Sequence, residues 1–156
     1  MTFKVSGISA KEFQPFFAMS DAELAANNMT MMIADDSDPG FPCRVSLGHA
    51  APGERVLLTN FEHQPAASPY RSAHAIFVAE NSMEADVAVG EVPEPLQVRL
   101  LSVRAFDADH MMVDADVIDG SEAAAIFTRF FENDQVEYLQ VHYAKRGCYA
   151  AHVSRA

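Results

Sequence analysis

The sequence lacks a long apolar run, and its opening residues do not have the pattern of an export leader. None of its apolar runs approaches the roughly 18–20 residues that a membrane-spanning helix needs. The opening residues, MTFKVSGISAKEF, contain no basic segment followed by a long apolar stretch, so we expect no secretory signal. Hydrophobic residues nevertheless make up 49% of the chain, which is too many for a disordered protein. These features predict a single globular domain over residues 1–156, located in the cytoplasm.

Positive charge is scarce. Lys and Arg number 11 against 22 Asp and Glu, which gives a formal net charge of −11. No stretch supplies the basic stripe that displaces counterions from phosphates, so we expect neither nucleic acid nor an anionic membrane as a partner. Segment 80–94 gathers five acidic residues, contains Pro93 and has no Lys or Arg. We expect a solvated loop there, with docking of a basic partner as the alternative.

Cysteine is also scarce. Only Cys43 and Cys148 occur, and the absence of a Cys-x-x-Cys pair excludes a zinc ribbon or a thioredoxin motif. In a cytoplasmic protein both thiols are expected to be reduced. The sequence contains no GxGxxG, P-loop, HExxH or GxSxG motif either, so no motif assigns a metal or a nucleotide.

Short β-like segments separated by turns fill most of the chain. Capping boxes at 9–12 and 20–23 predict two short helices, and Ser121 is expected to begin a third with an apolar stripe at 126–131. Strands are predicted at 4–8, 29–34, 43–47, 55–63, 73–79, 98–106, 111–118, 136–144 and 148–154. Because hairpins outnumber crossover helices, the predicted class is α+β, a mostly antiparallel sheet built from hairpins with two or three short helices.

Polar residues gather in segment 60–74, NFEHQPAASPYRSAH, where two predicted strands meet at a loop. Such positions are favoured for sites, because rigid strands hold the side chains while the loop admits a ligand. If Phe61 pairs with His74, then His63 and His74 lie on one face as diagonal neighbours, with Cβ atoms about 7–8 Å apart or somewhat less. We expect this register.

Three kinds of chemistry fit these residues. His63 and His74 with a third ligand could hold a metal, but their spacing is not diagnostic. A histidine beside Cys43 or Cys148 could generate a thiolate nucleophile. Two arginines, Arg44 and Arg71, could clamp a carboxylate or phosphate. The structural alternative is that both histidines cap strand ends and Arg71 pairs with a surface acid.

The closing hairpin leaves one further alternative open. A connection of two or four residues across 145–147 would place His142 and Cys148 on opposite faces, whereas a connection of three residues would place them on the same face. A dyad between these two side chains therefore depends on the length of the turn.

Several strings in the sequence resemble the bacterial family catalogued as domain of unknown function 1203. They are Ser20-Asp-Ala-Glu-Leu24, Pro42-Cys-Arg-Val-Ser-Leu47, His63-Gln-Pro-Ala-Ala-Ser-Pro-Tyr-Arg71, His74-Ala-Ile-Phe-Val78, Arg104-Ala-Phe-Asp-Ala-Asp109 and Gly147-Cys-Tyr-Ala-Ala151. The resemblance implies a single-domain bacterial protein and transfers no activity.

These observations predict a pocket for a small anionic molecule, formed by the 43–47 strand, the 63–74 loop and the C-terminal hairpin. The predicted binding residues are Arg44, His63, Tyr70, Arg71, His74 and His142. In a catalytic version of this pocket, the candidates are Cys43, Cys148, His63 and His74. The alternatives are a non-catalytic interaction protein that docks a basic partner through the acidic 80–94 loop, and a His-based metal-binding protein.

Overall fold

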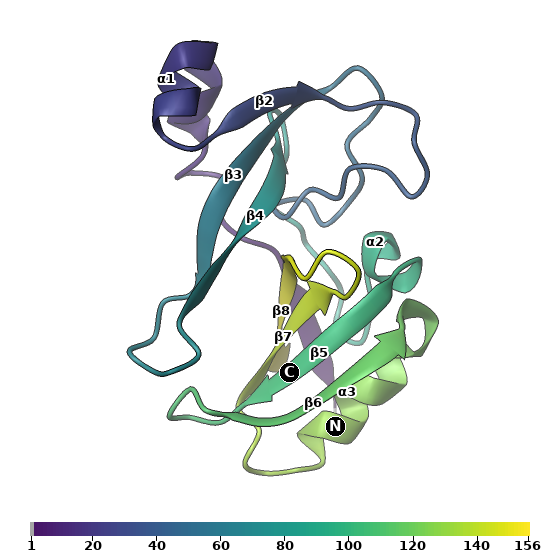
Figure 1. Cartoon of the computed structure of the whole chain (residues 1–156). Coiled ribbons are helices and arrows are strands. Elements are labelled where there is room, and N and C mark those ends of the chain that lie inside the picture. The colour runs from purple at the N-terminus through teal and green to yellow at the C-terminus, as the bar shows by residue number, and fades with distance from the viewer. Residues whose placement is uncertain (1) are drawn as a thin grey trace.

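Two antiparallel sheets form the framework of the protein (Figure 1). In the computed structural model, which describes residues 2–156, a five-stranded sheet has the order β1-β8-β7-β5-β6 and a three-stranded sheet the order β2-β3-β4. The strands are β1 (Phe3–Ser6), β2 (Thr30–Ile33), β3 (Arg55–Gln64), β4 (Ser72–Ala79), β5 (Leu100–Phe106), β6 (Met112–Asp119), β7 (Tyr138–Tyr143) and β8 (Tyr149–Arg155). The predicted α+β class with mostly antiparallel pairing is confirmed.

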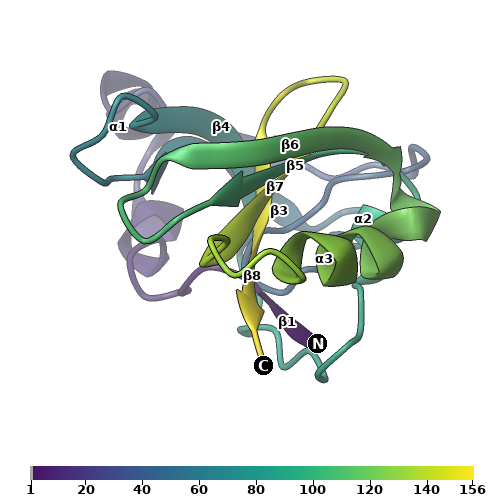
Figure 2. The same cartoon turned by 90° about the horizontal axis from the view of Figure 1, so that it is seen from below.

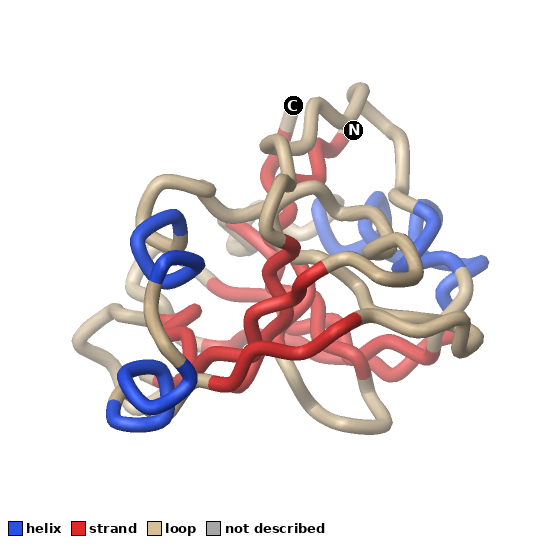
Figure 3. Tube along the Cα trace, turned by 90° about the horizontal axis from the view of Figure 1, so that it is seen from above, coloured by secondary structure: helices blue, strands red, loops and turns tan. Residues whose placement is uncertain are grey.

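The helices are short and lie at the periphery of the strands (Figure 3). They are η1 (Gln14–Ala18), α1 (Asp21–Ala26), α2 (Glu94–Gln97), η2 (Gly120–Glu122) and α3 (Ala123–Phe131). The capping box of Ser20 and Glu23 begins α1 as predicted. The predicted box at 9–12 is wrong, because Ser9 Oγ instead donates to Glu84 Oε1 at 2.7 Å and the helical turn that follows begins at Gln14.

The five-stranded sheet has one apolar and one polar face. Figure 2 shows α3 lying across this sheet beside β8 and β1, and the predicted apolar stripe of α3 buries Phe127, Phe130 and Phe131 in the core there. On the opposite face, β5 and β7 pair Ser102 with His142 and Arg104 with Gln140. Directly paired residues share a face, so these side chains form a polar layer.

The end of the β3–β4 hairpin packs against this polar layer. Gln140 of β7 accepts from His63 Nδ1 through Oε1 at 2.7 Å and donates to the carbonyl of His63 at 2.9 Å. The other part of the three-stranded sheet is covered by Phe13, Phe17 and Leu24 from the N-terminal helical segments. The junction between the two sheets is therefore polar, whereas both cores are apolar.

The predicted strand at 43–47 is wrong. The segment instead forms a tight turn, in which the Cys43 N–H donates to the Gly48 carbonyl at 2.8 Å and the Leu47 N–H donates to the Cys43 carbonyl at 3.0 Å. Only isolated bridges join it to neighbouring chain, Pro42 with His49 and Cys43 with Phe77. The physical reason is that Arg44 is almost completely buried, and the turn brings its charged group to acceptors on Pro42, Cys148 and Tyr149.

The acidic loop 80–94 is anchored to the protein at several points. Its Val87 and Val92 are buried, and Glu84 accepts hydrogen bonds from Ser9 and from the backbone of Ala10. Glu80 pairs with Arg55 at 2.6 Å. The acidic charge of this segment predicted a solvated loop. Its buried apolar side chains instead anchor it to the protein.

Gly7 tests the fit of the turn around Arg44. A Cβ atom at Gly7 would lie 2.6 Å from the carbonyl oxygens of Arg44 and Val45, which belong to the backbone. We expect Gly7→Ala to lower the free energy of unfolding in urea by about 2–3 kcal/mol through overpacking. In the control Gly48→Ala, the nearest atom would be Ser46 Oγ at 3.6 Å, so stability should change by less than about 1 kcal/mol. Equal stabilities for the two variants would contradict this close fit of the turn.

Candidate functional site

Arg44 is a buried cation that no carboxylate neutralises. It is only 1% exposed, and it donates from Nε to the Tyr149 carbonyl at 2.7 Å and from one terminal nitrogen to the Pro42 carbonyl at 2.6 Å. Its other terminal nitrogen contacts Cys148 Sγ at 3.1 Å. Among residues 2–156, no carboxylate oxygen forms an ion pair with Arg44 within 4.0 Å. The hydrogen bonds of the guanidinium are therefore partly satisfied while its charge is left without a counterion.

A cavity of about 820 Å³ lies beside Arg44. Its wall combines the loop 37–42 with Phe77 of β4, the start of β5 and the β7–β8 hairpin. Four of the 11 cationic side chains of the protein line it, namely Arg44, Arg99, Lys145 and Arg146. Asp38 is the one acidic residue of the wall among the described residues. In a chain of net charge −11, this cavity concentrates positive charge.

Arg99 and Tyr143 belong to the same wall. The guanidinium carbons of Arg44 and Arg99 lie 4.9 and 5.1 Å from the centre of the Tyr143 ring, a cation–π geometry. Arg99 also donates to the carbonyls of Pro39 and Pro95, at 2.9 Å in each case. Burial raises the pKa of Tyr143 and lowers that of Arg99. The wall thus holds two desolvated guanidiniums around one neutral aromatic ring.

The two cysteines occupy different environments. Cys148 is half-buried and lines the cavity, whereas Cys43 is 2% exposed and receives a hydrogen bond from the Ala79 N–H at 3.4 Å. Burial raises the pKa of Cys43, but hydrogen bonds from Ala79 and Ser46 outweigh this effect and lower it. Both thiols are free. Of the two, Cys148 is the thiol that faces the cavity.

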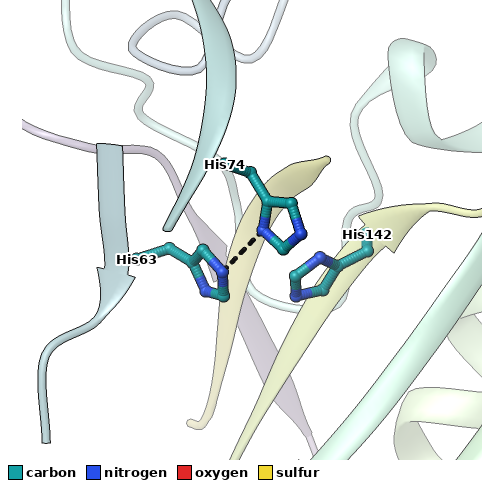
Figure 4. Close-up of side chains that lie close together, drawn as sticks. All are labelled: His63, His74 and His142. Carbon is teal, nitrogen blue, oxygen red and sulfur yellow. Dashed lines mark hydrogen bonds between the residues drawn. The ribbon is translucent and has the colours of Figure 1, made fainter. Parts of the chain in front are cut away.

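A second group of candidate side chains, three histidines, lies between the sheets. His63 and His74 stand at the end of the β3–β4 hairpin, in the predicted register that pairs Phe61 with His74. A bulge follows Phe61, and the two imidazole rings stack with centres 4.8 Å apart. His142 reaches them from β7 of the other sheet, so the three rings point toward one another (Figure 4).

The chain belongs to the DUF1203 family. The model of this family, described as a protein of unknown function, matches residues 40–155 and so spans both groups of side chains. The resemblance seen in the sequence is thereby confirmed. No curated protein and no solved structure matches the chain. Across residues 2–156, none of the helices combines the length and apolar character that crossing a membrane requires.

In this DUF1203 protein the predicted binding residues separate into two groups. Arg44 lies at the cavity, and the three histidines lie between the sheets. Arg71 instead pairs with Glu62 at 3.0 Å on the surface, and Tyr70 packs edge-on against Phe106 with ring centres 6.0 Å apart. Neither Tyr70 nor Arg71 lines the cavity.

Four residues of the cavity wall were not predicted from the sequence: Arg99, Tyr143, Lys145 and Arg146. The sequence feature that bears on them is the scarcity of cations, since four of only 11 positive side chains line one cavity in which Asp38 is the acidic residue. Cys148 contacts Arg44, and no histidine of the described chain forms a hydrogen bond with either thiol.

Acid should destabilise this DUF1203 protein through His142. The pKa of this imidazole is lowered from 6.5 to about 3, mainly by burial; the hydrogen bond to Gly147 opposes this effect, and Arg104, His63 and His74 add smaller lowering effects. The unfolded chain therefore takes up a proton near its ordinary pKa while the folded chain does not, so stability is complete above that pKa and falls as the pH decreases toward 3. In metal-free buffer we expect a loss on the order of 2 kcal/mol in unfolding free energy from pH 6.5 to pH 5.

Two variants check the assignment of this pH dependence. Urea unfolding of His142→Gln should show a shallower loss of stability over this pH range. The control His110→Gln removes an exposed histidine and should keep the slope of the natural sequence. Identical slopes in all three proteins would contradict a role for His142.

Proposed function

We propose that the protein binds an anionic organic molecule in the cavity beside Arg44. The observation that supports this most strongly is the buried guanidinium of Arg44, which has no carboxylate partner and lines a cavity together with three further cations. Burying a charge without a counterion costs several kcal/mol of folding free energy. Binding an anion from solution beside that charge would offset this cost. Because the chain as a whole is acidic, attraction for anions is concentrated at this cavity and not spread over the surface.

The hydrogen-bonding capacity of Arg44 also supports a ligand. A guanidinium has five N–H groups, and three of them are used by Tyr149, Pro42 and Cys148. Two N–H groups on the terminal nitrogens remain for an oxyanion. Lys145 and Arg146 are exposed on the β7–β8 turn, so they add attraction at the mouth of the cavity without a cost of burial.

The rest of the wall indicates an apolar body for the ligand. Phe41, Phe77, Leu100 and Met32 line the cavity, and its volume lies in the range of sites for small organic molecules. An inorganic anion would leave these surfaces in contact with water. The favoured class is therefore an organic carboxylate or phosphate monoester that carries an apolar chain or ring.

Decanoate and its neutral analogue 1-decanol test this proposal by calorimetric titration below the concentration at which either aggregates. We expect decanoate to bind with a stoichiometry of one. Decanol should bind at least about tenfold more weakly, because it lacks the carboxylate that the cations of the cavity would attract. The double variant Lys145→Gln/Arg146→Gln should weaken decanoate binding by about fivefold or more. The control Lys11→Gln/Arg71→Gln changes net charge equally at exposed positions outside the cavity and should stay within about twofold of the natural sequence. Equal affinities for decanoate and decanol, or equal losses in both double variants, would refute an anion site here.

The thiols provide an independent test of the same cavity. Iodoacetamide should label Cys148 at least about tenfold faster than Cys43, because only Cys148 faces the cavity and Cys43 is buried. Saturating decanoate should slow the labelling of Cys148 and leave that of Cys43 unchanged. Peptide mass spectrometry over a time course measures both rates. Labelling of Cys148 that is indifferent to decanoate would contradict occupation of the cavity.

A further inference from the structure

The three histidines between the sheets form a cluster separate from the Arg44 cavity. One ring nitrogen from each of His63, His74 and His142 can be chosen so that all three lie within 4.8 Å of one another. They come from β3, β4 and β7, so the cluster forms only when the two sheets pack together. None of the three lines the cavity described above.

Hydrogen bonds fix which nitrogen of His63 is available. Gln140 donates from Nε2 to the His63 carbonyl at 2.9 Å, so its Oε1 is the atom that lies 2.7 Å from His63 Nδ1. An amide oxygen only accepts, and therefore His63 Nδ1 must carry the proton. His63 Nε2 then carries the lone pair, which accepts from His74 Nδ1 at 2.8 Å and lies 3.1 Å from Ser72 Oγ.

His142 is fixed in the same way and has an unused acceptor. Its Nδ1 lies 3.0 Å from the carbonyl oxygen of Gly147, which can only accept, so Nδ1 carries the proton and Nε2 the lone pair. The side chain is 0% exposed, and Nε2 is the buried side-chain nitrogen or oxygen atom of the described chain that has no hydrogen-bond partner. Buried polar atoms are seldom left unpaired, so this nitrogen indicates a missing partner.

The protonation states suit a cation. Neutral imidazole is the form that ligates a metal, and the hydrogen bonds of Nδ1 leave the lone pair of His63 and of His142 on Nε2, where a metal ion could accept it. The hydrogen bonds of His63 to Gln140 and of His142 to Gly147 are those that orient metal-binding histidines, in which the non-ligating N–H is held by a carbonyl or similar acceptor.

We propose that His63, His74 and His142 bind one divalent first-row transition-metal ion through His63 Nε2, His142 Nε2 and one nitrogen of His74. Imidazole nitrogens 2.0–2.1 Å from a tetrahedral ion are separated by about 3.3–3.4 Å. In this structure the distances between the ring nitrogens run from 2.8 Å, between His63 Nε2 and His74 Nδ1, up to at most 4.8 Å. Small side-chain movements would bring all three distances to the separation that a tetrahedral ion needs. Three neutral nitrogens favour Zn²⁺, Co²⁺, Ni²⁺ or Cu²⁺ over Mg²⁺ or Ca²⁺.

Three protein ligands leave a fourth position for water or an external anion, as in catalytic rather than structural zinc sites. Arg104 lies on the same face of the sheet as Gln140 and His142, close enough to lower the pKa of all three histidines. A positive group beside a metal ion favours an anion in the open position. The proposed site is therefore a metal centre with an exchangeable anionic ligand.

Titration of the metal-stripped full chain with Co²⁺ and Zn²⁺ tests the proposal. We expect one equivalent of Co²⁺ to produce visible ligand-field absorption that Zn²⁺ abolishes by displacement, together with a rise in melting temperature. His74→Gln, at the most exposed of the three positions, should bind either metal at least about tenfold more weakly. His142→Gln should weaken metal binding by a similar factor. If His142→Gln fails to fold, the result for His74→Gln alone decides the test.

Two control variants show whether metal binding depends on these three histidines. His110→Gln, which removes an exposed histidine outside the cluster, should bind metal as the natural sequence does. Lys145→Gln/Arg146→Gln should also bind metal normally, so failure of the decanoate experiment and failure of this one are independent. Absence of stoichiometric Co²⁺ and Zn²⁺ binding, or equal binding by His74→Gln and the natural sequence, would overturn the proposal.

Discussion

The burial of the Arg44 guanidinium is the constraint on which the arrangement of the two sheets depends. Its Nε donates to the carbonyl of Tyr149 in β8, while the neighbouring Cys43 bridges to Phe77 in β4, so the turn 42–48 connects one sheet to the other. A carboxylate in this position would neutralise the charge and close the site. Carbonyl oxygens instead hold the cation in place while its charge remains available to the adjacent cavity.

The β7–β8 hairpin joins the two proposed sites. The backbone carbonyl of Tyr149 accepts from Arg44, and its ring stacks on His63 with centres 5.1 Å apart. At the turn, Gly147 has φ +78°, a conformation that glycine adopts without strain, and its carbonyl accepts from His142 Nδ1. Because Cys148 follows directly and contacts Arg44, a movement of this hairpin would alter both sites together.

Local patterns predicted the fold well wherever neighbouring residues determine the structure. The Ser20 capping box, the register of Phe61 with His74 and the apolar stripe of α3 all follow from short-range spacing. Contacts between residues that are distant in the sequence leave no comparable spacing pattern. The approach of His142 to His63 and that of Arg44 to Tyr143 depend on how distant segments of the chain pack together.

The segment around Arg44 shows why the remaining predictions failed. The segment from Cys43 to Leu47 has the composition of a strand, but the need to surround one buried cation with acceptors overrode this local preference. The clamp predicted from Arg44 and Arg71 does not form, because the two side chains lie in different places. With two sheets, Arg71 lies on the surface beside Glu62, and Arg99 stands near Arg44 instead.

A crystal structure of the protein grown with decanoate would test the central claim most directly. We expect a carboxylate inside the cavity, with an oxygen about 2.7–3.2 Å from a guanidinium nitrogen of Arg44 or Arg99 and the alkyl chain against Phe41 and Phe77. A decanoate bound elsewhere, or a carboxylate of the chain itself seated on Arg44, would contradict an anion site in this cavity.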